Sequence, residues 1–152
     1  MKSYYFMFQE GSKINQVVCA ILINMPVFVY GSSIGWMSPM TLLLQSDKTP
    51  RGTKLTDFEV SCMAAVPYII CMPATFLTAA LADKIGRKHT MYFLSATGFC
   101  CWAIKLSSMN FWAFMAARAL VGIIMAGSYV VCPLYTKEIS EDSIRGLLGS
   151  LI

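Results

Sequence analysis

The chain has 152 residues, of which 57% are hydrophobic and 13% are charged, and its formal net charge is +4. Soluble domains carry about 25% charged residues, so this chain has too little charge to cover a surface that faces water. We therefore exclude a soluble globular protein. The basic residues form no continuous stripe, so the positive charge predicts no nucleic-acid partner.

The apolar residues gather in long blocks that contain little or no charge. A helix needs about 20 apolar residues to cross the hydrocarbon core of a bilayer, and four blocks reach about that length. We predict an all-α, polytopic bundle with transmembrane helices near residues 16–38, 60–81, 90–108 and 111–135. Residues 1–15 are expected to form a separate cytoplasmic segment, and a fifth helix is expected to begin near Gly146.

The third predicted span is the most polar, because Lys105 lies inside it. A lysine near the end of a helix can extend its ammonium group to the membrane surface. The nearby aromatic residues Trp102, Phe111 and Trp112 resemble the aromatic belt found at that surface. The ammonium of Lys105 can therefore reach the membrane surface.

The distribution of basic residues predicts the orientation. With four spans, both tails and the 82–89 loop share one side of the membrane. That side carries Lys2, Lys13, Lys84, Arg87, Lys88, Lys137 and Arg145, and the other carries Lys48, Arg51, Lys54 and Lys105. Because basic residues concentrate in cytoplasmic loops, the bias places the N-terminus in the cytoplasm.

The cysteines and the single histidine predict no catalytic or metal site. All six cysteines lie in apolar spans without the spacing of metal ligands, so we interpret them as small buried side chains and predict no disulfide, metal or other cofactor. His89 lies beside Lys88, with no nucleophile or acid arranged near it. We therefore do not expect an enzyme.

The first of two charged borders runs from Leu81 to Lys88. Asp83 and Arg87 are four residues apart and would face each other across one turn if the preceding helix continues. Gly86 would let the chain turn sharply between two helices. An ordinary solvated loop with basic residues explains the same pattern, so spacing alone does not decide between a site and a loop.

The second charged border runs from Pro133 to Gly146. Arg145 follows Glu138 by seven residues, or two helical turns, so both can lie on one helix face. Charges of both signs beside the membrane suggest ion pairs between helix ends. Exposed pairs contribute only about 0–1 kcal/mol each, so they can form in one conformation and break in another, as a gate requires.

These borders resemble two motifs of the sugar transporters of the major facilitator superfamily. The stretch DKIGRK at residues 83–88 resembles the loop between helices two and three. Arg118 and Gly122, followed by the PLYTKEI and RG stretches of residues 133–146, resemble the sugar-transport signature of helix four. Residues 31–39, GSSIGWMSP, resemble the end of helix one in the insect trehalose-type branch. The chain thus resembles the N-terminal part of facilitative glucose and trehalose transporters.

The resemblance implies a role for each residue of the charged borders. Asp83, Arg87, Glu138 and Arg145 would form a cytoplasmic salt-bridge network that holds the outward-facing state, and Gly86 would shape the loop. It also implies a multi-pass protein of the plasma membrane. Residues 16–152 would form part of a transporter bundle, an N-terminal fragment that is not expected to transport alone.

Arg118 lies inside the fourth predicted span. An arginine at that depth is costly and usually faces a cavity or a partner. Alternatively, its side chain reaches the membrane surface, because Arg118 is only about 10 Å from Phe111 along a helix. The sequence leaves both positions open.

The first span contains no carboxylate. In proton-coupled relatives an aspartate stands where this chain has Ser33, so the resemblance favours facilitated diffusion of a hexose or trehalose by alternating access. Tyr30, Ser32 and Ser33 could donate hydrogen bonds to such a sugar, although small residues also serve helix packing. The alternatives are a proton-coupled sugar or polyol symporter and a non-transporting membrane protein that binds a partner.

Overall fold

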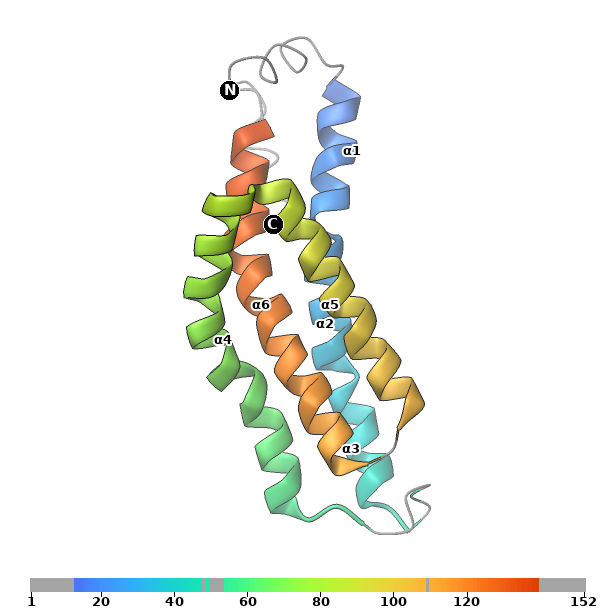
Figure 1. Cartoon of the computed structure of the whole chain (residues 1–152). Coiled ribbons are helices and arrows are strands. Elements are labelled where there is room, and N and C mark those ends of the chain that lie inside the picture. Colours follow the sequence, from blue (N-terminus) through green and yellow to red (C-terminus); the bar gives the residue numbers. More distant parts are fainter. Residues whose placement is uncertain (1–12, 48, 50–53, 109, 140–152) are drawn as a thin grey trace.

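The computed structural model describes residues 13–47, 49, 54–108 and 110–139. Every regular element in these ranges is a helix (Figure 1). The helices are α1 (Lys13–Ile23), α2 (Met25–Gly35), α3 (Met37–Gln45), α4 (Asp57–Ile85), α5 (Arg87–Ser107) and α6 (Phe111–Ile139). This architecture confirms the predicted all-α class.

Helices α1, α2 and α3 follow one another along one line (Figure 1). Pro26 falls in the first turn of α2, where a missing N–H costs no intrahelical bond. At the second junction the amide of Trp36 still donates to the carbonyl of Ser32 at 2.9 Å, so the hydrogen-bonded path continues. The stretch Val18–Gln45 is long and apolar enough to cross a membrane, and it extends beyond residue 38, where we predicted the first span to end.

Two further helices, α4 and α6, also contain stretches long and apolar enough to cross a membrane. Helix α5 occupies the region of the predicted third span, and its 21 residues would reach about 31 Å at 1.5 Å per residue. It is not one of the three apolar stretches found in the described part of the chain. Its basic residues at both ends and several serines and threonines lower its apolarity.

The ends of α4 follow from its sequence. Thr56 and Glu59 form a reciprocal capping box at its start, in which the backbone amide of Thr56 donates to Oε2 of Glu59 at 2.8 Å. This arrangement satisfies amides that the first helical turn leaves without partners. At the other end the chain turns at Gly86, whose φ of +95° is a conformation that glycine adopts readily.

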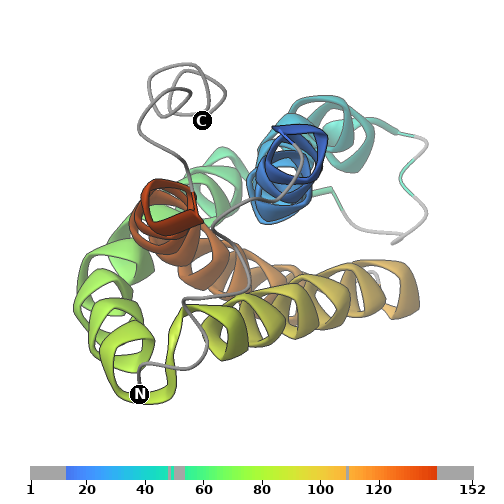
Figure 2. The same cartoon turned by 90° about the horizontal axis from the view of Figure 1, so that it is seen from above.

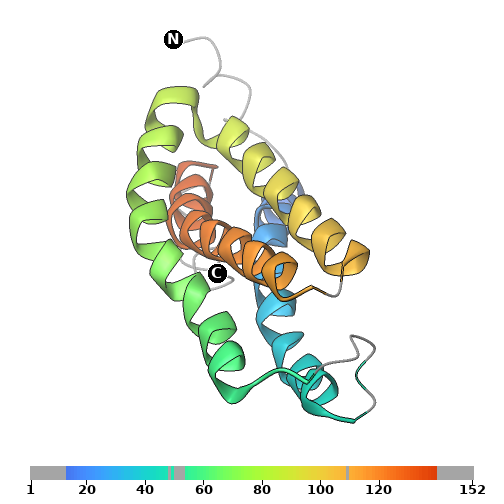
Figure 3. The ribbon, with the colours of Figure 1, turned by 60° about the horizontal axis from the view of Figure 1, so that its bottom comes forward.

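Helix α6 forms the centre of the bundle, with α4, α5 and α2 around it (Figure 2). Figure 3 shows α4 and α5 on opposite sides of α6. Over half of its most apolar stretch is buried, against less than a fifth of that in α4. The outer helices instead expose large apolar side chains, including those of Phe28, Met72 and Phe99. Such surfaces suit contact with lipid.

Two glycines let the outer helices approach α6 closely. A Cβ atom on Gly122 would lie 2.6 Å from the carbonyl oxygen of Pro67 in α4. One on Gly127 would lie 2.3 Å from a methyl group of Leu94 in α5. The first obstacle is backbone and cannot move alone, whereas the second is the end of a side chain that can rotate.

We predict that Gly122→Ala destabilises the bundle more than Gly127→Ala does. Separating two packed helices to admit a methyl group costs about 1–3 kcal/mol, whereas rotation of Leu94 relieves part of the second clash. Thermal unfolding of both variants in detergent measures the difference. Equal transition temperatures would show that α4 shifts as readily as the Leu94 side chain.

Candidate functional site

Three helix ends meet at one end of the bundle: the end of α4, the start of α5 and the end of α6 (Figure 1). Here Arg87 lies between two carboxylates. Its Nε is 3.0 Å from Oε1 of Glu138, and its Nη2 is 3.6 Å from Oδ1 of Asp83. The structure thus brings together three of the residues predicted to form an ion-pair network. We call this group the Arg87 cluster.

Gly86 positions Arg87 in this cluster. Its positive φ turns the chain between α4 and α5, so that Asp83 in the last turn of α4 faces the first residue of α5. A Cβ atom at Gly86 would meet nothing within 4 Å. The conformation, and not lack of space, therefore favours glycine here.

The ion pairs of the Arg87 cluster are weak because their side chains are exposed. The side chains of Arg87, Glu138 and Asp83 are 31%, 44% and 72% exposed, so water competes with each ion pair and each contributes about 0–1 kcal/mol. Such pairs can break without unfolding the helices that carry them. Arg145, the remaining predicted member, and the predicted fifth helix near Gly146 lie outside the described residues.

Arg118 is the most buried charged residue of the described part of the chain, with 3% of its surface exposed. Its side chain points into the bundle, where it contacts two neighbouring helices. Nε donates a 2.8 Å hydrogen bond to the carbonyl oxygen of Met63 in α4, and Nη1 donates one of 3.3 Å to the carbonyl oxygen of Ser33 in α2. Arg118 therefore joins three helices through backbone acceptors.

The carbonyl of Met63 is free to accept because of Pro67. In an α-helix that carbonyl would accept from the amide four residues later, and that residue is Pro67, which has no N–H. Arg118 supplies the missing donor. Sequence reasoning placed Arg118 in the membrane but missed this partner. The available signal was the proline inside a predicted span.

The described residues place no carboxylate beside Arg118. The acidic residues among them are Asp47, Asp57, Glu59, Asp83 and Glu138, and all lie in loops or in the end turns of helices. Within this part of the chain, the hydrogen bonds of the guanidinium go to backbone carbonyl oxygens and not to a carboxylate.

Lys105 lies in the last turn of α5, and its side chain turns into the bundle, where it is only 5% exposed. Its Nζ lies 4.7 Å from the ring centroid of Trp36 and 4.5 Å from that of Trp102. The negative faces of two indoles attract a cation strongly where water is excluded, which explains why the side chain turns inward.

The three predicted substrate-path residues differ in position. Ser33 is fully buried and Ser32 is half-buried, with its carbonyl occupied by the amide of Trp36. Tyr30 is half-buried and forms an edge-to-face pair with Tyr129 of α6, with ring centroids 6.1 Å apart. Tyr30 thus contacts a side chain that is itself exposed. Sequence reasoning did not identify Tyr129.

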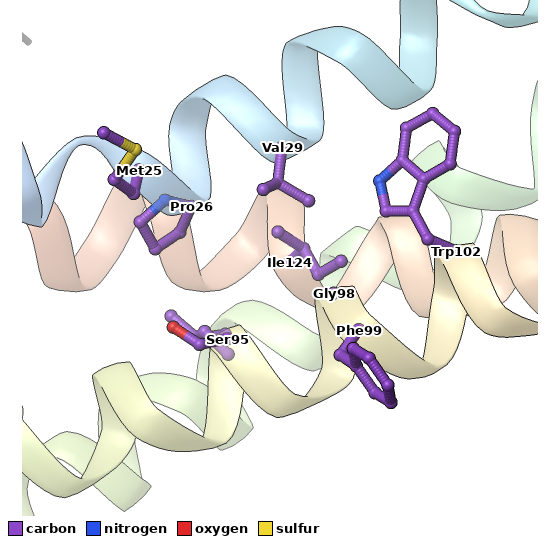
Figure 4. Close-up of a pocket in the computed structure, with 9 residues that line it drawn as sticks. Met25, Pro26, Val29, Ser95, Gly98, Phe99, Trp102 and Ile124 are labelled. Carbon is purple, nitrogen blue, oxygen red and sulfur yellow. The ribbon is translucent and has the colours of Figure 1, made fainter.

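A cavity of about 250 Å³ lies between α2 and α5. Figure 4 shows Pro26 and Val29 of α2 facing Ser95 and Gly98 of α5, while the ring of Phe99 turns away from α2. Its lining is almost wholly apolar. A sugar needs several placed polar groups to fix its orientation, so this cavity does not suit one.

The long apolar helices, whose described acidic residues all lie in loops or end turns, define a multi-pass membrane protein. Residues 18–152 match the family model described as "Sugar (and other) transporter". The chain belongs to this sugar transporter family, as the sequence motifs predicted.

Named relatives agree with this assignment. The chain is 29% identical over 132 residues to Polyol transporter 5 of Arabidopsis thaliana, covering 87% of this chain and 24% of the relative. It is 24% identical over 136 residues to Facilitated trehalose transporter Tret1 of Polypedilum vanderplanki, covering 90% and 27%. It is 27% identical over 123 residues to mouse Solute carrier family 2, facilitated glucose transporter member 8, covering 81% and 26%.

The chain thus spans about a quarter of the length of the relatives it matches. The family and these relatives are transporters and not enzymes. No solved structure matches the chain.

We predict that the role of Arg118 depends on Pro67. Arg118→Leu leaves the carbonyl of Met63 buried without a donor, which costs about 1–3 kcal/mol. Pro67→Ala restores the amide that an unbroken helix offers to that carbonyl. The double variant should therefore lose less stability than the sum of the two single variants.

A double-mutant cycle on thermal or denaturant unfolding in detergent measures this coupling. The matched control is Pro73→Ala, which restores an amide elsewhere in α4. If Pro73→Ala compensates Arg118→Leu as well as Pro67→Ala does, the Met63 carbonyl is not the partner that matters.

Proposed function

We propose that this chain contributes helices to a carrier that moves a hexose, trehalose or polyol across the membrane by facilitated diffusion. Family membership supports transport, and the printed names of the relatives supply the solute classes. In this proposal the carrier works by alternating access, in which two helical bundles rock around a site near the membrane midplane. The described helices would supply one wall of that site.

The observation that carries the uniport proposal is the environment of Arg118. Coupling to protons requires a group inside the membrane that gains and loses a proton. The described membrane interior offers no carboxylate to do so, and Arg118 is bound to the carbonyls of Met63 and Ser33. An arginine held by backbone carbonyls stays protonated, so it neither takes up nor releases a proton during transport. Facilitated diffusion requires no group that exchanges protons.

We infer that the Arg87 cluster serves as the cytoplasmic gate. Its three residues connect α4, α5 and α6, and their ion pairs are weak enough to open. The excess of basic residues supports a cytoplasmic position for this end and for the N-terminus. The plasma membrane is the proposed location. Arg145 would extend the gate from residues beyond those described.

Uptake by the complete natural polypeptide that carries this sequence tests the proposal. In cells or proteoliposomes we expect labelled glucose, trehalose or sorbitol to enter until inside and outside concentrations are equal. Uptake should be unchanged when a protonophore collapses the proton gradient. Accumulation that a protonophore abolishes would instead establish a proton symporter, whose acid would lie outside the described residues. Absence of uptake for every solute would favour the non-transporting alternative.

The gate proposal predicts charge complementation between Arg87 and Glu138. Arg87→Glu and Glu138→Arg should each lower the uptake rate, by about two- to five-fold if only the energy of an exposed pair is lost. The double reversal should recover part of the rate because it restores opposite charges at 3.0 Å. Asp83→Asn is the matched control with a smaller expected effect, since its pair is longer and more exposed. A double reversal no better than either single reversal would refute the gate.

A further inference from the structure

Three tyrosines lie away from the ends of the long apolar stretches: Tyr30 in α2, Tyr68 in α4 and Tyr129 in α6. Tyr129 precedes Glu138 by nine residues, or about 14 Å along α6, and Tyr68 follows Asp57 by eleven residues, or about 17 Å along α4. Helices α4 and α6 run in the same direction with Met63 beside Arg118, so the two tyrosines differ by about 9 Å in depth. Both are therefore well inside a hydrocarbon core of ~30 Å, and the ring of Tyr30 contacts that of Tyr129.

The side chains of Tyr129 and Tyr68 are 64% and 53% exposed. An exposed tyrosine is common at the membrane surface, where its hydroxyl meets water and headgroups. In the middle of the hydrocarbon the same hydroxyl would have no water to bond, and leaving it without a partner costs free energy. Two exposed tyrosines at this depth therefore point to a polar path and not to lipid.

The position of Tyr30 strengthens this argument. One side of Tyr30 packs against the buried cluster that includes Cys101, Val121 and Ile124, so its ring is fixed. Its edge-to-face contact fixes the ring of Tyr129 in turn. Tyr68 follows Pro67, whose carbonyl oxygen packs closely against Gly122 of α6. The three tyrosines come from α2, α4 and α6, and α2 and α4 both pack against α6 (Figure 2).

We propose that Tyr30, Tyr68 and Tyr129 form an aromatic wall of the water-filled path, and that Tyr129 contacts the carbon skeleton of a polyhydroxylated solute. An aromatic face covers the C–H groups of such a solute, and a phenol hydroxyl bonds to its hydroxyl groups. Pockets that combine apolar walls with few polar groups select small ligands in this way. The proposal rests on the transport function proposed above and adds a specificity-determining residue to it.

Thiol accessibility tests whether the wall faces water. In the complete polypeptide, from which the native cysteines have been removed, Tyr129→Cys should react with a charged, membrane-impermeant methanethiosulfonate reagent. The matched control is Phe99→Cys, because Phe99 is 76% exposed, lies about 18 Å along α5 from Arg87 and faces away from α2 (Figure 4). This variant should not react. Equal reactivity of the two variants, or no reaction of Tyr129→Cys, would overturn the proposal.

Uptake kinetics then test contact with the solute. Tyr129→Phe keeps the ring and loses the hydroxyl, so we expect KM for the transported solute to rise about three- to ten-fold with little change in maximal rate. Tyr129→Ala should raise KM further. Tyr92→Phe, an exposed tyrosine near the start of α5, should leave KM unchanged. An unchanged KM in Tyr129→Phe and Tyr129→Ala would refute the contact.

The two experiments separate failure of this inference from failure of the proposed function. If the wild-type polypeptide takes up solute and Tyr129→Cys stays unreactive, transport stands and the aromatic wall is wrong. If Tyr129→Cys reacts but the wild type takes up no glucose, trehalose or sorbitol, the path is wet and the proposed solute class is wrong.

Discussion

The constraint on which the rest of the structure depends is that hydrocarbon offers no water to backbone carbonyls and amides. Pro67 breaks the hydrogen-bond pattern of α4 at the depth where this matters, and Arg118 supplies the donor that Pro67 lacks. The carbonyl dipole of Met63 in turn stabilises the charge of Arg118. The hydrogen bond thus satisfies both the buried carbonyl of Met63 and the buried charge of Arg118. Together with the bond to Ser33, it holds α4, α6 and α2 against one another at the centre of the bundle.

At the charged end of the bundle the ion pairs are exposed, in contrast to the buried Arg118. Water reaches Asp83, Arg87 and Glu138, so their ion pairs are weak and reversible. The buried contacts of Arg118 can persist while the exposed ion pairs at the ends of α4, α5 and α6 form and break. This division suits a bundle that moves as one body within a larger carrier.

The sequence predicted the helical class because blocks without charge and of membrane length have few other stable structures. It also predicted that Asp83, Arg87 and Glu138 belong together, because their motifs occur in a known order. It did not predict the partners of Arg118 or the inward position of Lys105, since both depend on residues brought close only by folding. Tyr129 was missed for a related reason. Hydropathy shows that a helix crosses the membrane but does not show which of its faces meets water.

The contact of Lys105 with two indoles has a practical consequence. Trp36 and Trp102 are two of the three tryptophans of the chain, and both lie within 5 Å of the same ammonium. Trp36 also stands at the junction between α2 and α3. Two of the three indoles in this stretch therefore report on the contact between the α2–α3 junction and α5. A change in that contact would alter their ultraviolet emission, which spectroscopy detects without an added dye.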